Sequence, residues 1–197
     1  RAEPGKWLEV RQIVDLYVEH RNELKRKAAE AAVLAPLGLT HTSFLQLQAS
    51  MAPVLVRQLA EDLINFPMPS SSCIVCGVDD RGGQIYTVDN GHVTYHNAVG
   101  FAASGIGHWH AESEMMSAGH NVNRNVAETV ALVHRAKKRA ETAPGVGEGT
   151  DMFMVNGRGG YNTFRSGIPE KLDELYERLA EEETAARQKI HGELDAY

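Results

Sequence analysis

The dipeptide Asn90-Gly91 constrains the fold of this chain more than any other feature of the sequence. It lies between the β-rich runs "QIYTVD" and "HVTYH". Asn-Gly is the strongest short-range signal for a two-residue hairpin turn, because both residues adopt positive φ at little cost. The run "SCIVCGVD" precedes this hairpin, connected through "DRGG", and "AVGFAAS" follows it as a further strand candidate. We therefore expect an antiparallel meander of consecutive strands.

Two helices are predicted before the meander. The apolar residues of the first, starting at Val10, recur at spacings of three and four, which is typical of a charged helix with one apolar stripe. A break at Pro36 and Gly38 separates it from a second helix, for which Thr42 or Ser43 is the expected N-cap. The second stripe comprises Phe44, Leu47, Met51, Leu55, Leu59 and Leu63.

Two more helices, a hairpin and a last helix are predicted after the meander. The two helices cover residues 108–118 and 125–141. The residues of the second that should face inward are Val126, Val130, Val133 and Ala140. A hairpin of "TDMFMVN" and "YNTFR" follows, and a charged helix, with Pro169 in its first turn, covers residues 169–197. This order of elements predicts a single α+β domain over residues 1–197.

The composition indicates a soluble globular protein and argues against two classes of partner. A formal net charge of -6 disfavours a general nucleic-acid-binding surface. No apolar run approaches the roughly 18 residues that a membrane-spanning helix needs, and no signal-peptide pattern stands at the start. Two cysteines are too few for a disulfide framework, so we expect a reducing, cytoplasmic environment. The chain opens on Arg1 rather than Met, which indicates processing or a piece of a longer protein.

The pair "CIVC", Cys73 to Cys76, raises the question of a redox or zinc site. The stretch around it has the pattern of a buried strand, and residues three apart on a strand point to opposite faces. Neither a disulfide nor a shared metal ion follows from that geometry. We therefore expect both cysteines to be core residues.

The stretch "AASGIGHWHAES" places Gly105 and Gly107 between a strand candidate and a helix, where a nucleotide cradle would stand. Such a cradle belongs to a parallel βαβ unit, whereas here a tight hairpin precedes the glycines and a second helix follows. A tight turn and close packing of the helix on the sheet explain both glycines without a ligand. Nucleotide binding by this turn stays open as an alternative function.

His108 and His110 are two residues apart, which is the wrong spacing for metal ligands on one helical face. Each residue turns a helix by about 100°, so the two side chains diverge by about 200°. Glu112 and Glu114 are explained by the dipole at the start of their helix, and the basic cluster 135–139 by the dipole at the end of the next one. The sequence also has no G-x-S-x-G nucleophile elbow. We therefore assign no catalytic, cofactor-binding or metal-binding residue.

Three stretches together resemble the proteasome subunit family of N-terminal nucleophile hydrolases. They are "CIVCGVDDRGGQIYTVDNGHV", "VGFAASGIGHWHAES" and "VAETVALVHRAKKRAETAPGVGEGTDMFMV". The first is similar to the family's central strands, the second to its strand, Gly-Ser-Gly turn and helix, and the third to the helix, glycine loop and strand that follow. The resemblance covers most of residues 10–164 and is closer to divergent prokaryotic proteasome-like proteins than to the well-known α and β rings.

The resemblance implies a four-layer αββα sandwich, in which two antiparallel sheets lie between helical layers. It implies threonine-type (or Ser- or Cys-type) peptide hydrolysis, in which the side chain of the first residue attacks and its free amine acts as base. It also implies assembly into rings. The family's nucleophile and its Asp and Lys partners lie on strands that precede the first helix, and this chain begins at that helix. We therefore expect the sandwich to be incomplete at the N-terminus.

Several positions depart from the family's catalytic pattern. Ile106 stands where the family has the serine of the Gly-Ser-Gly turn. Ala143 and Val146 stand roughly where its Asp and Ser support the nucleophile, and Glu141 or Thr142 are the nearest polar substitutes.

The expected function is a proteasome-like subunit that supplies scaffold and assembly surface without the nucleophile. It would be an enzyme only if missing N-terminal strands supply that group. Its expected partners are further copies of itself or a companion chain carrying the N-terminal strands, with a peptide substrate if active. The alternatives are an inactive structural ring subunit and a nucleotide-binding protein using Gly105 and Gly107.

Overall fold

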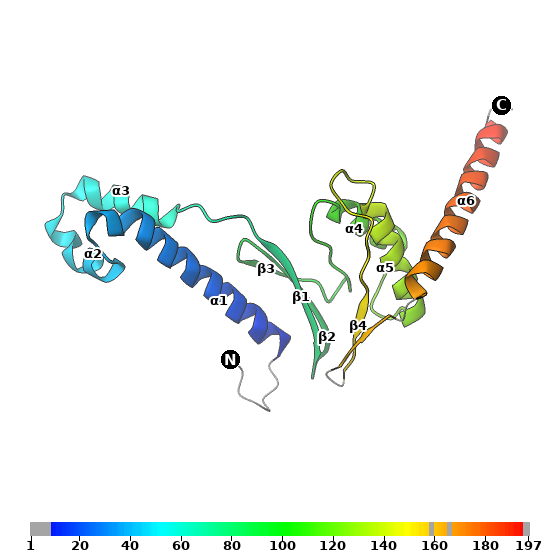
Figure 1. Ribbon diagram of the computed structural model, residues 1–197, viewed down its shortest axis with the longest axis horizontal. Helices are drawn as coiled ribbons and strands as arrows, with labels where there is room; N and C mark the ends of the chain where they lie inside the picture. Colours follow the sequence, from blue (N-terminus) through cyan, green and yellow to red (C-terminus); the bar gives the residue numbers. More distant parts are fainter. Residues whose placement is uncertain (1–8, 158–159, 165–166, 195–197) are drawn as a thin grey trace. The chain divides into compact units, whose positions relative to one another are not determined.

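The computed structural model describes residues 9–157, 160–164 and 167–194, and it is a mixture of helices with two small sheets (Figure 1). The expected α+β class is confirmed. The chain divides into two compact units, each described by itself below. The first comprises Arg1–Val75 and Tyr86–Thr94, and the second Cys76–Ile85 and Tyr95–Tyr197. None of the described helices combines the length and the apolar character needed to cross a membrane.

The first unit begins with a helical region. Its elements are α1 (Val10–Ala29), the π turn η1 (Glu30–Leu34), the short turn η2 (Ala35–Leu37), α2 (His41–Leu47), the short turn η3 (Gln48–Ser50) and α3 (Pro53–Ile64). Leu34, Phe44 and Leu59 form one buried cluster of this region. The predicted stripe residues Phe44 and Leu59 are therefore core residues, whereas Leu47 and Leu55 are exposed.

The second predicted helix differs from the structure in two ways. Its N-cap is Thr40, not Thr42 or Ser43. The Thr40 Oγ1 accepts from the Ser43 backbone N–H at 3.1 Å, and the Thr40 N–H donates back to the Ser43 Oγ at 2.8 Å. This reciprocal capping box satisfies two backbone donors of the first turn. The helix also ends at Leu47, and α3 starts anew at Pro53, because proline has no N–H to continue a helix and suits a first turn.

A three-stranded sheet follows in the order β1 (Ser72–Asp79), β2 (Gly82–Asp89) and β3 (His92–Tyr95). Asn90 and Gly91 have φ of 52° and 87°, so the predicted two-residue hairpin is confirmed. Strands β1 and β2 are likewise joined by two residues, and consecutive strands therefore run antiparallel. Val10 and Val14 of α1 pack against Tyr86 and Val88 of β2 in a buried cluster of the first unit.

The predicted fourth strand, "AVGFAAS", does not form. Asn97 follows β3, and its side chain bonds backbone groups of β2 at the place where β3 would otherwise continue. Its Oδ1 accepts from the Ile85 N–H at 2.8 Å, and its Nδ2 donates to the Gly83 carbonyl at 2.9 Å. Gly100, with φ of 78°, then turns the chain away from an extended path. A polar side chain thus ends the ladder after β3.

The second unit contains α4 (His108–Ser117), α5 (Val126–Ala140), the strand pair β4 (Phe153–Val155) and β5 (Tyr161–Thr163), and α6 (Ile168–Leu194). The two predicted helices, the hairpin and the helix with Pro169 in its first turn are confirmed, the last as far as Leu194; residues 195–197 of the prediction lie outside the described residues. Met115 of α4 packs with Leu132 and Ala136 of α5 in the core of this unit. Among the described residues of α6, only Leu172 is buried.

The inward face of α5 differs from the prediction. Ala140 is buried as predicted, but Val126 and Val133 are 60% and 43% exposed, and the other buried residues are Leu132, His134 and Ala136. Residues 132, 136 and 140 share one face at a spacing of four, and His134 lies on another. Two elements, α4 and α6, supply contacts to these two faces, so α5 is buried along more than the single stripe that was predicted.

Candidate functional site

The stretch that connects to α4 meets the loop after α5, and we call this the turn-loop junction: residues 105–107 with Ala140, Ala143, Gly145 and Val146. Gly105 has φ of 99°, a conformation that favours glycine. Gly107 is the N-cap of α4 and is buried. The Gly105 carbonyl lies 2.8 Å from the Nδ1 of His108, so this histidine belongs to the first turn of α4.

Gly107 is required by close packing. A Cβ placed on it would lie 2.8 Å from the Ala140 Cβ, 2.9 Å from the Ala140 carbonyl oxygen and 3.1 Å from the Val146 Cγ2. Gly105 has open space at the same position. One glycine therefore makes the turn, as expected, and the other lets α4 approach the end of α5 rather than pack on a sheet, as the sequence had predicted.

The junction gathers the positions at which the resemblance expects catalytic support. Val146 lies against Gly107, and the Cδ1 of Ile106 would lie 3.5 Å from a Cβ on Gly145. Ala143 is 7% exposed. These three side chains, Ile106, Ala143 and Val146, are aliphatic and can neither transfer a proton nor hydrogen-bond an amine.

The nearest polar substitutes have other partners. Glu141 pairs with Lys137 at 2.6 Å and with Lys138 at 3.5 Å. The hydroxyl of Thr142 donates to the Arg139 carbonyl at 2.7 Å. Both side chains therefore serve the C-terminal end of α5, and the junction is chemically a packing site.

Glu114 forms a buried ionic cluster that the sequence did not indicate. Its side chain is 7% exposed, and its Oε1 lies 2.5 Å from the Nε of Arg135, while its Oε2 lies 3.5 Å from the Nε of Arg139. Arg135 also reaches Glu183 of α6 at 3.1 Å. The helix-dipole interpretation of Glu112 and Glu114 is wrong, since neither residue lies in the first turn of α4, and Glu114 pairs across to α5.

His134 was also missed, and it connects α5 to α6. The ring is 2% exposed, its Nε2 lies 3.1 Å from the Asp173 Oδ1, and it meets the ring of Tyr176 edge-on at 6.4 Å. Lys138, one turn further along α5, lies 2.9 Å from the same carboxylate. The spacing of His134 and Lys138 could have suggested one face, but no local pattern indicated their acidic partner, Asp173.

The contact between Lys138 and Asp173 lowers the pKa of the Asp173 carboxyl and raises the pKa of the Lys138 ammonium, chiefly through their hydrogen bond. A lowered carboxyl pKa contributes stability above the ordinary value of about 4, which is lost as pH falls through the folded-state pKa. A raised ammonium pKa contributes stability below its ordinary value of about 10, which is lost as pH rises through the folded-state pKa.

We therefore expect the pair to stabilise the packing of α6 between about pH 5 and pH 10, by about 1 kcal/mol or less because Asp173 is half-exposed. Urea unfolding, followed by circular dichroism at several pH values, should show that Asp173→Asn loses this extra stability between about pH 5 and pH 10. The matched control is Glu174→Gln, whose partner Lys171 lies on the same helix. A pH profile for Asp173→Asn that matches the unaltered chain would contradict this role.

The cysteines and the histidine pair occupy separate environments. Cys73 packs against the α1-strand core, whereas Cys76 is exposed on the opposite face of β1. The prediction of opposite faces is confirmed, and the prediction that both are core residues is wrong for Cys76. His110 is exposed. Among the described residues, no three or more His, Cys, Asp or Glu side chains come together closely enough to hold a metal ion.

Comparison of the chain with family models gave no match, and comparison with curated proteins gave none either.

Proposed function

We propose that this chain is part of a proteasome-like subunit of the N-terminal nucleophile type, and that it supplies scaffold and assembly surface rather than the nucleophile. The observation that carries the proposal is the turn-loop junction. There the chain joins the two segments that the resemblance assigns to catalytic support, yet Ile106, Ala143 and Val146 leave that place without a polar side chain.

The order of elements supports the same assignment. An antiparallel meander, the turn at Gly105 and Gly107, the α4–α5 pair, a glycine-containing loop and a strand follow one another as in the family pattern. The finer expectation, a four-layer αββα sandwich, belongs to this proposal. It requires that additional strands join the two small sheets and that helices cover both outer faces.

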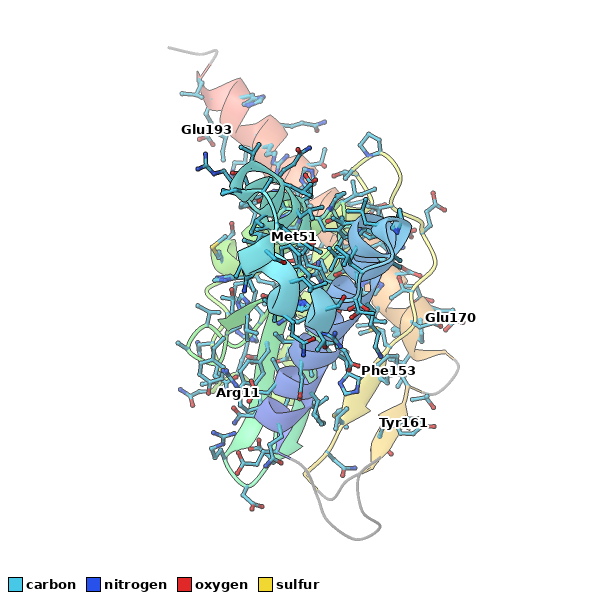
Figure 2. All side chains as sticks on the ribbon, turned by 90° about the vertical axis from the view of Figure 1, so that its left-hand side faces the viewer. Arg11, Met51, Phe153, Tyr161, Glu170 and Glu193 are labelled. Atoms are coloured by element: carbon cyan, nitrogen blue, oxygen red, sulfur yellow. The ribbon has the colours of Figure 1, made fainter. Side chains whose placement is uncertain are left out.

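The β4–β5 pair is the place where such strands would be added. Phe153 pairs with Thr163 and Val155 with Tyr161, so these residues share one face of the pair. Phe153 and Tyr161 are 67% and 73% exposed, and Figure 2 labels both on their strands. An isolated two-stranded sheet is at best marginally stable, so we propose that strands from a companion chain or further copies complete it.

The assembly is tested by measuring the native protein, purified from its source, by native mass spectrometry. We expect a closed oligomer containing this chain. The same preparation is then treated with a peptide that carries an electrophile able to trap an N-terminal nucleophile. If the assembly is active, the label should appear on a companion strand-bearing segment and on none of the residues described above.

The possible outcomes separate the proposals. An oligomer that never accepts the label supports the inactive structural ring subunit, which the aliphatic junction also favours. A protein that stays monomeric at all concentrations would contradict both the scaffold subunit of an active assembly and the inactive ring subunit. Nucleotide binding by Gly105 and Gly107 would raise the melting temperature on addition of nucleotide, but Ala140 and Val146 cover Gly107 where a phosphate would have to approach.

A further inference from the structure

A groove of about 490 Å³ in the second unit is distinct from the turn-loop junction. The start of β2, the loop after β3, the α4–α5 connection and the first turn of α5 line it. Its volume is within the range of small-molecule sites, about 300–1,000 Å³. The residues that matter below are Ile85, Gly100, His120, Val122 and Arg124, all of which line the groove.

The walls of the groove are held by specific contacts. Asn97 fixes the loop after β3 to β2 through the hydrogen bonds that end the sheet. Gly100 allows this loop to approach the α4–α5 connection, because a Cβ on it would lie 2.8 Å from the Val122 Cγ1 and 3.6 Å from the His120 Nε2. The groove therefore depends on residue 100 being glycine, because any side chain there would collide with the α4–α5 connection.

The charge of the lining is positive in a chain whose net charge is -6. No aspartate or glutamate lines the groove within the described residues. The Nη2 of Arg124 donates to the Ala118 carbonyl at 2.6 Å, which positions the guanidinium. In the described part of the chain this guanidinium forms no ion pair. Its remaining N–H groups therefore have no carboxylate partner within the described residues.

His120 adds a second polar group that lacks a partner. Its ring meets Phe101 edge-on at 5.9 Å, and its Nδ1 is buried without a hydrogen bond among the described residues. A buried polar atom without a partner is unfavourable. The torsion that rotates the ring is soft, and a half-turn exchanges the two edges of the imidazole. An acceptor in the groove would therefore give the ring nitrogen a partner.

We propose that this groove binds a small carboxylate that carries a short apolar substituent. A guanidinium offers two parallel N–H groups to the two oxygens of a carboxylate, and His120 can complete the hydrogen bonding. One permanent cation matches the single negative charge of a carboxylate, and the planar fork of its N–H groups matches the two carboxylate oxygens better than it matches a tetrahedral phosphate, which is partly doubly charged at neutral pH. Ile85 and Val122 provide apolar surface for the substituent.

The binding test uses isovalerate, the isosteric neutral isovaleramide, and inorganic phosphate as probes, each titrated into the ¹⁵N-labelled chain and followed by NMR. We expect isovalerate to shift the amides of Gly100, Val122 and Arg124, and to bind at least about tenfold more tightly than isovaleramide, because the charge-assisted pair is lost with the amide. Equal binding of the two, or no shift by isovalerate, would overturn the proposal. Tighter binding of phosphate would replace the carboxylate assignment with a phosphate one.

Variants locate the site. Arg124→Gln should weaken isovalerate binding at least about tenfold, and Arg124→Lys less, because it keeps the charge and loses the fork. Gly100→Ala should also weaken binding by filling the groove wall. The matched control is Arg57→Gln, an exposed arginine of α3. If Arg124→Gln keeps the circular dichroism of the parent chain and also its isovalerate affinity, the assignment is wrong.

Discussion

Replacing Arg135 by methionine should lower the free energy of unfolding by about 3 kcal/mol. The change leaves the Glu114 carboxylate, 7% exposed, without the partner at 2.5 Å. Removing one partner of a buried pair typically costs about 3–5 kcal/mol, because a charge stays buried without compensation. The lower end applies here, since Arg139 still lies 3.5 Å from the other oxygen.

Replacing the acidic partner, Glu114, should lower the free energy of unfolding by less than replacing Arg135. Glu114→Met leaves Arg135, which is 37% exposed and can reach solvent or Glu183, and we expect about 1–2 kcal/mol. The double variant should recover part of the loss, because it removes both charges together. Chemical denaturation of all three, analysed as a double-mutant cycle, measures the coupling.

The control for this cycle is Arg178→Met, on the exposed side of α6. Arg178 has no ion pair among the described residues, and its replacement should change stability by less than about 0.5 kcal/mol. Additive losses from the two single variants, with no coupling between Glu114 and Arg135, would contradict the buried ionic cluster.

Replacing Gly107 by alanine should lower the free energy of unfolding by about 1–3 kcal/mol through overpacking. The new Cβ would lie 2.8 Å from the Cβ of Ala140 and 2.9 Å from its carbonyl oxygen. The second of these is a backbone oxygen of α5, which cannot move aside as a flexible side chain could. The helix pair must therefore separate, and thermal and urea unfolding should both report the loss.

Two matched glycines separate packing from backbone strain. Gly105→Ala should cost about 1 kcal/mol from its positive φ alone, since nothing lies near its Cβ position. Gly149→Ala meets no neighbour either and has no positive φ, so it should be neutral or slightly stabilising. A Gly107→Ala variant as stable as Gly149→Ala would show that α4 and α5 are not packed as described.

The features that the sequence predicted correctly are those that short stretches decide. Asn90-Gly91 forms its hairpin because two adjacent residues can adopt positive φ. Cys73 and Cys76 point to opposite faces because strand geometry alternates with every residue. The start of α5 has the Asn125 side chain as its cap, and α6 has Pro169 in its first turn, preferences that depend on a few neighbouring residues.

The failures have the opposite origin, since each depends on residues distant in the sequence. "AVGFAAS" has the composition of a strand, but Asn97 ends the β2–β3 ladder and Gly100, with φ of 78°, turns the chain away from an extended path. Val126 and Val133 have the spacing of an inward face, but the contacts of α4 and α6 bury Leu132 and His134 instead. An apolar pattern limits which faces can be buried, and the neighbouring elements select among them.

The candidate site divides in the same way. The sequence by itself determined that Gly105 and Gly107 make a turn into a helix, because φ freedom and small size are properties of single residues. Only the tertiary structure decided that Ala140 and Val146 meet that turn, and that Glu114 and Arg135 pair across two helices. Contacts across such separations depend on how helices pack, and no local pattern encodes the partner.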